Sequence, residues 1–79
     1  MNIEDVVSNI KSGDLILFTH NFCFTVSGRE DYAPKDQLCF VLSAINPYRY
    51  YVYFTIIVGN KLQQIKIYDT YARHIVKIV

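Results

Sequence analysis

The feature that most constrains the fold is a pair of alternating segments on either side of Gly59-Asn60. Gly and Asn between two such segments are typical of a two-residue β-hairpin turn. If Val58 and Lys61 flank the turn, one register sorts both strands into a mainly apolar face and an aromatic, partly polar face. The predicted pairs on the first face are Val52 with Ile67, Phe54 with Ile65 and Ile56 with Gln63. Those on the second face are Tyr51 with Tyr68, Tyr53 with Lys66, Thr55 with Gln64 and Ile57 with Leu62.

The start of the chain has helical rather than alternating spacing. Residues 2–11 predict a short helix whose apolar stripe is Ile3, Val6, Val7 and Ile10. Asn2 is suited to cap this helix and Gly13 to end it. Because so short a helix is marginal alone, its stripe is expected to dock on the rest of the domain, or alternatively on a partner.

Beyond Gly13 the pattern indicates short strands. They are expected over residues 14–18, 38–45, 48–58 and 74–79, with another short strand before a turn at Ser27-Gly28. Residues 38–45 are apolar on both faces, as in a central strand, and Asn46-Pro47 is expected to break that strand. Residues 29–37 are polar and contain a proline, which predicts a loop, and "DTYAR" (69–73) is expected to form one helical turn.

Size and charge limit the classes of function. The 79 residues form one domain over 1–79, with 52% hydrophobic residues to build its core. Charged residues make up 19%, below the roughly 25% of typical soluble domains, so exposed apolar surface and a partner are expected. The net charge of +1 lacks the basic excess of a dedicated nucleic-acid binder, although a local patch remains open.

The chain has no pattern typical of secretion or membrane insertion, and a cytoplasmic location is expected. Tyr50 to Val58 is its longest apolar segment, far short of the ~20 residues of a transmembrane helix. Cys23 and Cys39 lack metal-binding spacing and are interpreted as buried free thiols, with a disulfide as the alternative. A composition rich in Ile, Asn, Lys, Tyr and Phe suits an A/T-rich genome, including many phage genomes.

No catalytic, metal or cofactor motif is recognisable, and a non-enzymatic protein without cofactors is expected. The three glycines stand apart, so they form no phosphate loop. His20 and His74 are far apart in sequence and have no ligand-type neighbours at metal spacing. Cys23, His74 and Asp69 form a conceivable nucleophilic set, but Cys23 lies between two phenylalanines, where burial would raise its pKa and blunt its reactivity.

The first candidate binding surface is the aromatic face of the predicted hairpin. Tyr51, Tyr53 and Tyr68 are expected to point outward beside Lys66, with Tyr50 at the rim of the core and Tyr48 in a turn. Such tyrosines can simply pack across strands, can dock a protein, or can stack on the bases of a single-stranded nucleic acid. In the nucleic-acid alternative, Arg49 and Lys61 would contact phosphates.

Two further surfaces are candidates for a partner. The first is the long predicted loop from Asn21 to Gln37. Its candidate residues are Arg29, Glu30, Asp31, Tyr32 and Lys35. A solvated loop of mixed charge is the simpler interpretation, and docking there would act through charge complementarity. The second is the last strand, which has no charged residue after Lys77, so its edge could pair with another copy and form a homo-oligomer.

The order of elements from Ser12 to Val79 resembles a Src-homology-three-like small barrel, the class that includes KOW-type modules. The shared features are "GDLILF" at the first strand, a long loop, the tight hairpin and a helical turn before the last strand. The resemblance implies a five- to six-stranded antiparallel barrel whose ligand surface lies beside the Asn21 to Gln37 loop. Such barrels bind peptides, ribosomal or polymerase partners, or nucleic acid, and many small phage accessory proteins resemble them.

A second resemblance is to MazF-type toxin ribonucleases. It rests on Gly13-Asp14-Leu15 in the first strand and on Val41-Leu42-Ser43 in a later one. In that family an Arg-Pro pair precedes the later strand, and its arginine takes part in RNA cleavage. Here "QLCF" stands before it, so the resemblance implies at most a degenerate ribonuclease.

Overall fold

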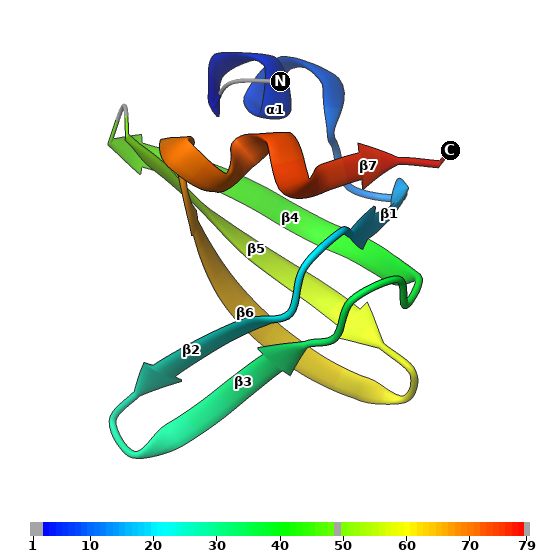
Figure 1. Ribbon diagram of the computed structural model, residues 1–79, viewed down its shortest axis with the longest axis vertical. Coiled ribbons are helices and arrows are strands. Elements are labelled where there is room, and N and C mark those ends of the chain that lie inside the picture. Colours follow the sequence, from blue (N-terminus) through cyan, green and yellow to red (C-terminus); the bar gives the residue numbers. More distant parts are fainter. Residues whose placement is uncertain (1–2, 49, 79) are drawn as a thin grey trace.

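The computed structural model describes residues 3–48 and 50–78 and is mainly β, with antiparallel sheets and a short helix (Figure 1). A five-stranded sheet has the order β6-β5-β4-β1-β7, and β2 and β3 form a separate two-stranded sheet. The elements, in chain order, are α1 (Ile3–Asn9), β1 (Leu15–Phe18), β2 (Phe22–Val26), β3 (Arg29–Ala33), β4 (Cys39–Tyr48), β5 (Tyr51–Val58), β6 (Lys61–Tyr68), the 3₁₀ helix η1 (Asp69–His74) and β7 (Ile75–Lys77).

The β5–β6 hairpin has the register expected from the sequence. Tyr51 pairs with Tyr68, Val52 with Ile67, and the ladder continues without a shift to Val58 and Lys61. Gly59 has φ +64°, a left-handed conformation that glycine adopts without steric cost. The alternation of side chains and the turn chemistry therefore agree on one register.

The core lies on one face of the five-stranded sheet, and α1, η1 and the β2–β3 hairpin cover it. Figure 1 shows α1 and η1 near one end of the sheet and the β2–β3 hairpin at the other. Val6 and Ile10 of the helical segment are buried among β-sheet residues, so the expected docking of the helix on its own domain is confirmed. The helix is shorter than the expected range 2–11, and Asn2 and the side chains of Ile3 and Val7 lie outside the described residues.

The expected break of the central strand at Asn46-Pro47 is wrong. β4 lies between β5 and β1, as a central strand should, but it continues to Tyr48, so Tyr48 lies at the strand end and not in a turn. The pairing with β5 shifts between Ile45 and Tyr48, which lets the proline lie at an irregularity.

The expected loop over 29–37, and with it the long loop from Asn21 to Gln37, is also corrected. Arg29–Ala33 forms β3, which pairs with β2 in a hairpin of unshifted register. The turn has positive φ at Ser27 (49°) and Gly28 (79°), so it is a second two-residue hairpin turn. The sequence did not indicate this strand, because the charged residues of β3 interrupt the apolar–polar alternation that is typical of strands.

The last strand is an edge of the large sheet. β7 pairs with β1 and is reached through η1, which confirms the expected helical turn before it. Lys77 Nζ donates to Asn9 O at 2.8 Å and lies 3.4 Å from Asp14 Oδ2, which ties this edge to α1. None of the helices in the described ranges is long and apolar enough to span a membrane.

Candidate functional site

Four of the expected site residues gather on the face of the β5–β6 hairpin that is turned away from the core. We call Tyr51, Tyr53, Lys66 and Tyr68 the tyrosine–lysine cluster. Lys66 Nζ lies 4.2 Å from the ring centroid of Tyr51, 5.0 Å from that of Tyr68 and 5.8 Å from that of Tyr53. These distances are within the range of cation–π attraction, so three rings hold one ammonium group.

Two expectations about tyrosine exposure are wrong. Tyr51 is only 7% exposed, because Tyr50, Tyr53 and Tyr68 all pack against its ring. Tyr50, which was expected at the rim of the core, is 58% exposed. The outward surface of the cluster is therefore made by Tyr68 and part of Tyr53, with Tyr50 beside them.

The charge of Lys66 is stabilised by its aromatic neighbours. Hydrogen bonding with Tyr68 raises the pKa of Lys66 above its ordinary value, and partial desolvation opposes this. The ion pairs among the described residues are Asp31 with Arg29 and Asp14 with Lys77, and neither includes Lys66. The ammonium group is thus fixed by rings and still has capacity to bind an acceptor.

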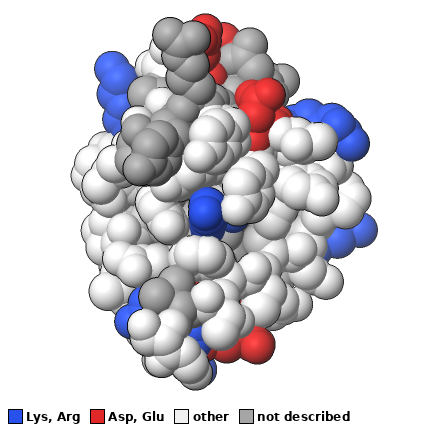
Figure 2. Space-filling view, turned by 90° about the vertical axis from the view of Figure 1, so that its left-hand side faces the viewer, with Lys and Arg blue, Asp and Glu red and all other residues white. Residues whose placement is uncertain are grey.

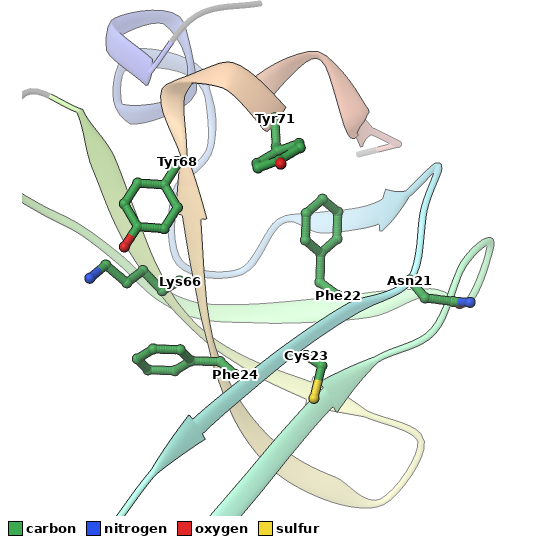
Figure 3. Close-up of a pocket in the computed structure, with 7 residues that line it drawn as sticks. All are labelled: Asn21, Phe22, Cys23, Phe24, Lys66, Tyr68 and Tyr71. Carbon is green, nitrogen blue, oxygen red and sulfur yellow. The ribbon is translucent and has the colours of Figure 1, made fainter.

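A groove lies beside the cluster, with a volume of about 440 Å³. Its lining comes from β2 and the residue before it, from β6 and from η1. The lining residues are Asn21, Phe22, Cys23, Phe24, Lys66, Tyr68 and Tyr71. Figure 3 shows Phe22 and Tyr71 directed toward one another, with Lys66 between Tyr68 and Phe24. We call this the aromatic groove, and Lys66 is the one charged residue among the described residues that line it.

Packing of the groove walls on the core holds them in place. The ring of Phe22 lies 5.1 Å from that of buried Phe18 and 6.2 Å from that of Tyr71, both edge to face. The ring of Phe24 lies 5.8 Å from that of Tyr53. Figure 2 shows a largely uncharged face with a hollow around a basic side chain. Aromatic walls and one fixed cation suit a ligand that is apolar with a negative group.

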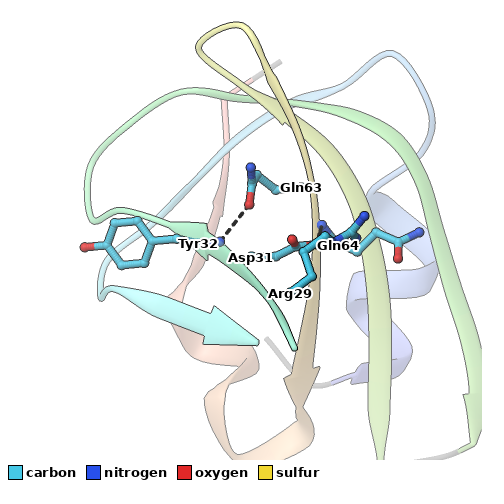
Figure 4. Close-up of polar contacts among 5 residues, drawn as sticks. All are labelled: Arg29, Asp31, Tyr32, Gln63 and Gln64. Carbon is cyan, nitrogen blue, oxygen red and sulfur yellow. Dashed lines mark hydrogen bonds and ion pairs between the residues drawn. The ribbon is translucent and has the colours of Figure 1, made fainter. Parts of the chain in front are cut away.

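The second candidate surface is a strand with a structural role, and not a solvated loop. Asp31 is 4% exposed and accepts hydrogen bonds from Gln64 N at 2.7 Å and from Arg29 at 2.8 Å. Tyr32 N donates to the Gln63 side chain at 2.8 Å, as Figure 4 shows. These bonds join β3 to β6. Side-chain acceptors thus replace a backbone ladder between the two sheets.

The outer members of this second candidate line a smaller cavity. Glu30 and Tyr32 border a volume of about 260 Å³ together with Lys61. Lys35 is exposed, and its N–H donates to Asn21. Arg49 lies outside the described residues. Side chains alternate between the two faces along β6, and Lys61 is at an odd position while Lys66 is at an even one. The two lysines therefore project from opposite faces of the sheet and form no basic stripe.

The cysteines differ from the expected pair of buried thiols. Both are free; Cys39 is buried, and desolvation raises its pKa to about 11. Cys23 is exposed in the groove, although desolvation and then Glu30 raise its pKa above the ordinary value. This environment does not activate Cys23 as a nucleophile. Among the described residues no three His, Cys, Asp or Glu side chains gather as metal ligands.

The structure brings together two histidines that the sequence separates. The rings of His20 and His74 lie 3.8 Å apart, and the Thr19 hydroxyl lies 3.1 Å from the Nδ1 atom of each. Desolvation, and then the charges of His20 and Arg73, lower the pKa of His74. No local spacing could reveal this pair, because it forms where the end of η1 meets the corner between β1 and β2.

Comparison of this chain with protein-family models, with curated proteins and with solved structures found no match.

Proposed function

We propose that this protein is a non-enzymatic binding module that docks on another protein through the tyrosine–lysine cluster and the adjoining aromatic groove. The observation that carries the proposal is the fixed Lys66 ammonium in an uncharged aromatic surface. Tyrosines anchor protein interfaces well, because each supplies a large contact area at a small cost in conformational entropy.

Exposed apolar side chains support docking in preference to simple sheet packing. Tyr68 of the cluster is 43% exposed, Tyr50 beside Tyr51 is 58% exposed, and Tyr71 of the groove wall is 48% exposed. Ile45 pairs with Tyr53 on the same face and is 57% exposed. Contiguous apolar surface of this kind is typical of an interaction site.

We propose further that the fold is an open relative of the Src-homology-three-like barrels. Its support is the order of elements, with a tight hairpin and a 3₁₀ turn before the last strand. The hydrogen bonds from Gln64 to Asp31 and from Tyr32 to Gln63 would then stand where a closed barrel has a ladder. The ligand surface would lie beside the β2–β3 hairpin, where the aromatic groove is.

Affinity capture with surface variants tests the docking proposal. The tagged protein, Tyr68→Ser and Tyr32→Ser are compared for the proteins that they retain from one cell lysate after nuclease treatment. Tyr68 and Tyr32 are 43% and 46% exposed, so the two substitutions remove similar surface from different places. We expect Tyr68→Ser to weaken capture of a stoichiometric partner by about tenfold or more, and Tyr32→Ser to leave it unchanged.

Other results would overturn this assignment. Loss of capture with Tyr32→Ser alone would move the site to β3. Retention that disappears with nuclease would favour single-stranded nucleic acid stacked on the tyrosines, a complex that should weaken steeply with salt. If the capture recovers the chain alone, and light scattering shows an assembly of several copies, a homo-oligomer is favoured.

A further inference from the structure

The aromatic groove lies beside β6, which is an edge strand of the five-stranded sheet. Gln64 N points away from β5 and donates to Asp31, whereas Asp69 N points toward β5 and donates to Tyr50 O. In an antiparallel ladder such directions alternate along the strand. The backbone N–H and C=O groups of Lys66 therefore face away from β5, toward the groove.

Asp31 closes only one part of this edge. Its carboxylate takes the N–H of Gln64, which lies two residues before Lys66. In the described sheets β2 pairs with β3 and not with β6, and the groove lies past this contact with Phe22, Phe24 and Tyr71 as its walls. An exposed edge with adjoining side-chain pockets is the arrangement by which proteins add an extended peptide to a sheet.

The charge in the groove selects the chemistry of that peptide. Among the described residues Lys66 is the one charged residue of the lining, and no carboxylate there forms an ion pair with it. One ammonium group neutralises one carboxylate. A nucleic acid strand would bring a phosphate with every nucleotide, and the described residues that line the groove include no further cation to meet them.

On the basis of the proposed function, we propose that the aromatic groove binds an extended acidic peptide of a partner protein. The peptide pairs its backbone with β6 at Lys66, places an apolar side chain against Phe22, Phe24 and Tyr71, and sets an Asp or Glu carboxylate on Lys66 Nζ. The cation–π contacts keep Nζ in place, so little freedom remains to be lost when the carboxylate binds.

A selection from a library of random eight-residue linear peptides tests this proposal directly. The library is selected on wild-type protein, and individual peptides are then measured by fluorescence anisotropy against wild type, Lys66→Met and Lys61→Met. Methionine keeps the apolar stem of Lys66 on the tyrosine rings and removes the charge. Lys61 lies on the same strand but outside the groove, which makes it the matched control.

We expect enriched peptides to carry Asp or Glu close to an aliphatic or aromatic residue. Their affinity should fall by about tenfold or more in Lys66→Met and stay within twofold in Lys61→Met, since a charge-assisted hydrogen bond is lost only in the first. The proposal would be overturned if the selected peptides were basic or uncharged, or if no peptide were enriched. Equal affinities for wild type and Lys66→Met would also overturn it.

A second measurement leaves Lys66 unchanged and so does not depend on the folding of that variant. Cys23 is exposed and lines the groove, whereas Cys39 is buried. A saturating acidic peptide should slow the labelling of Cys23 by N-ethylmaleimide, and a bulky maleimide at Cys23 should abolish peptide binding. Unchanged labelling under saturation would place the peptide elsewhere.

The outcomes separate this inference from the proposed function. Capture of a partner that depends on Tyr68, without binding of acidic peptides, would keep the docking function and reject the peptide. Fluorescence anisotropy with labelled oligothymidine tests the nucleic-acid alternative in the same assay. If this oligonucleotide binds more tightly than any selected peptide, both the acidic-peptide proposal and the protein-docking function are rejected.

Discussion

The two hairpins of this protein both have two-residue turns but are held by different interactions. β5–β6 belongs to the large sheet and buries Phe54, Ile65 and Ile67 completely. β2–β3 stands apart as a two-stranded sheet and is joined to β6 by Asp31 and by the Gln63 side chain. Its aromatic residues Phe22 and Phe24 are only partly buried against the core.

The difference explains where a ligand site can form. A backbone ladder and a filled core leave no space between β5 and β6. Polar side-chain bonds join β3 to β6 at a few points, β2 has no backbone pairing with β6 in the described sheets, and the aromatic groove lies beside these two strands. We therefore expect β5–β6 to unfold only with the whole domain and β2–β3 to open at a lower free energy.

The sharpest test of this comparison removes one phenylalanine from each hairpin. Phe54 is fully buried, so Phe54→Ala should lower the free energy of unfolding by about 3–5 kcal/mol through lost burial and a cavity. Phe24 is partly buried at the groove, and Phe24→Ala should cost about 1 kcal/mol. Urea titration followed by circular dichroism measures both. Equal losses would contradict the distinction between the hairpins.

The next effect concerns the junction between the two sheets. Asp31→Asn keeps the shape but exchanges one acceptor oxygen for a donor amide beside Gln64 N and Arg29. We expect a loss of about 1–3 kcal/mol, as for a buried hydrogen bond left unsatisfied. Native-state hydrogen exchange should show faster opening of β2 and β3 and little change in β5. Glu30→Gln, at an exposed position, is the control. Similar hydrogen exchange in both variants would show that Asp31 does not hold the β2–β3 hairpin on β6.

The smallest effect is a pH dependence at the base of the β2–β3 hairpin. The pKa of His74 is lowered by desolvation and by His20 and Arg73, so the unfolded chain binds this proton more readily than the folded protein. Stability should be complete above the ordinary pKa of about 6.5 and decline as pH falls below it. The melting temperature should therefore drop between pH 7.5 and 5.5.

His74→Asn removes the titrating ring at this position and retains groups able to bond with the Thr19 hydroxyl. Its melting temperature should change less over the same interval. Asp14 does not interfere, because the backbone hydrogen bond from Lys11 and the charge of Lys77 lower its pKa from an ordinary value already below this window. An equal slope in wild type and His74→Asn would show that the pH dependence arises elsewhere.

The candidate site was predictable in part. One register across Gly59-Asn60 was enough to place Tyr51, Tyr53, Lys66 and Tyr68 on one face. The groove beside them was not predictable, since it needs β2 to lie near β6, from which it is separated by some forty positions in sequence. The charged strand β3 was also not predictable, because its buried carboxylate Asp31 accepts the hydrogen bond from Gln64 N only in the folded chain.

The sequence by itself determined the local elements: the alternation around Gly59-Asn60, the apolar stripe of Val6 and Ile10, and the turn before β7. Each depends on neighbours within a few residues, whose geometry is set by backbone sterics and side-chain periodicity. The tertiary structure decided which faces are covered. It buried Tyr51 and Asp31, exposed Tyr50 and Cys23, and joined His20 to His74. Burial is a property of the segments packed on a residue, and those segments are distant in sequence.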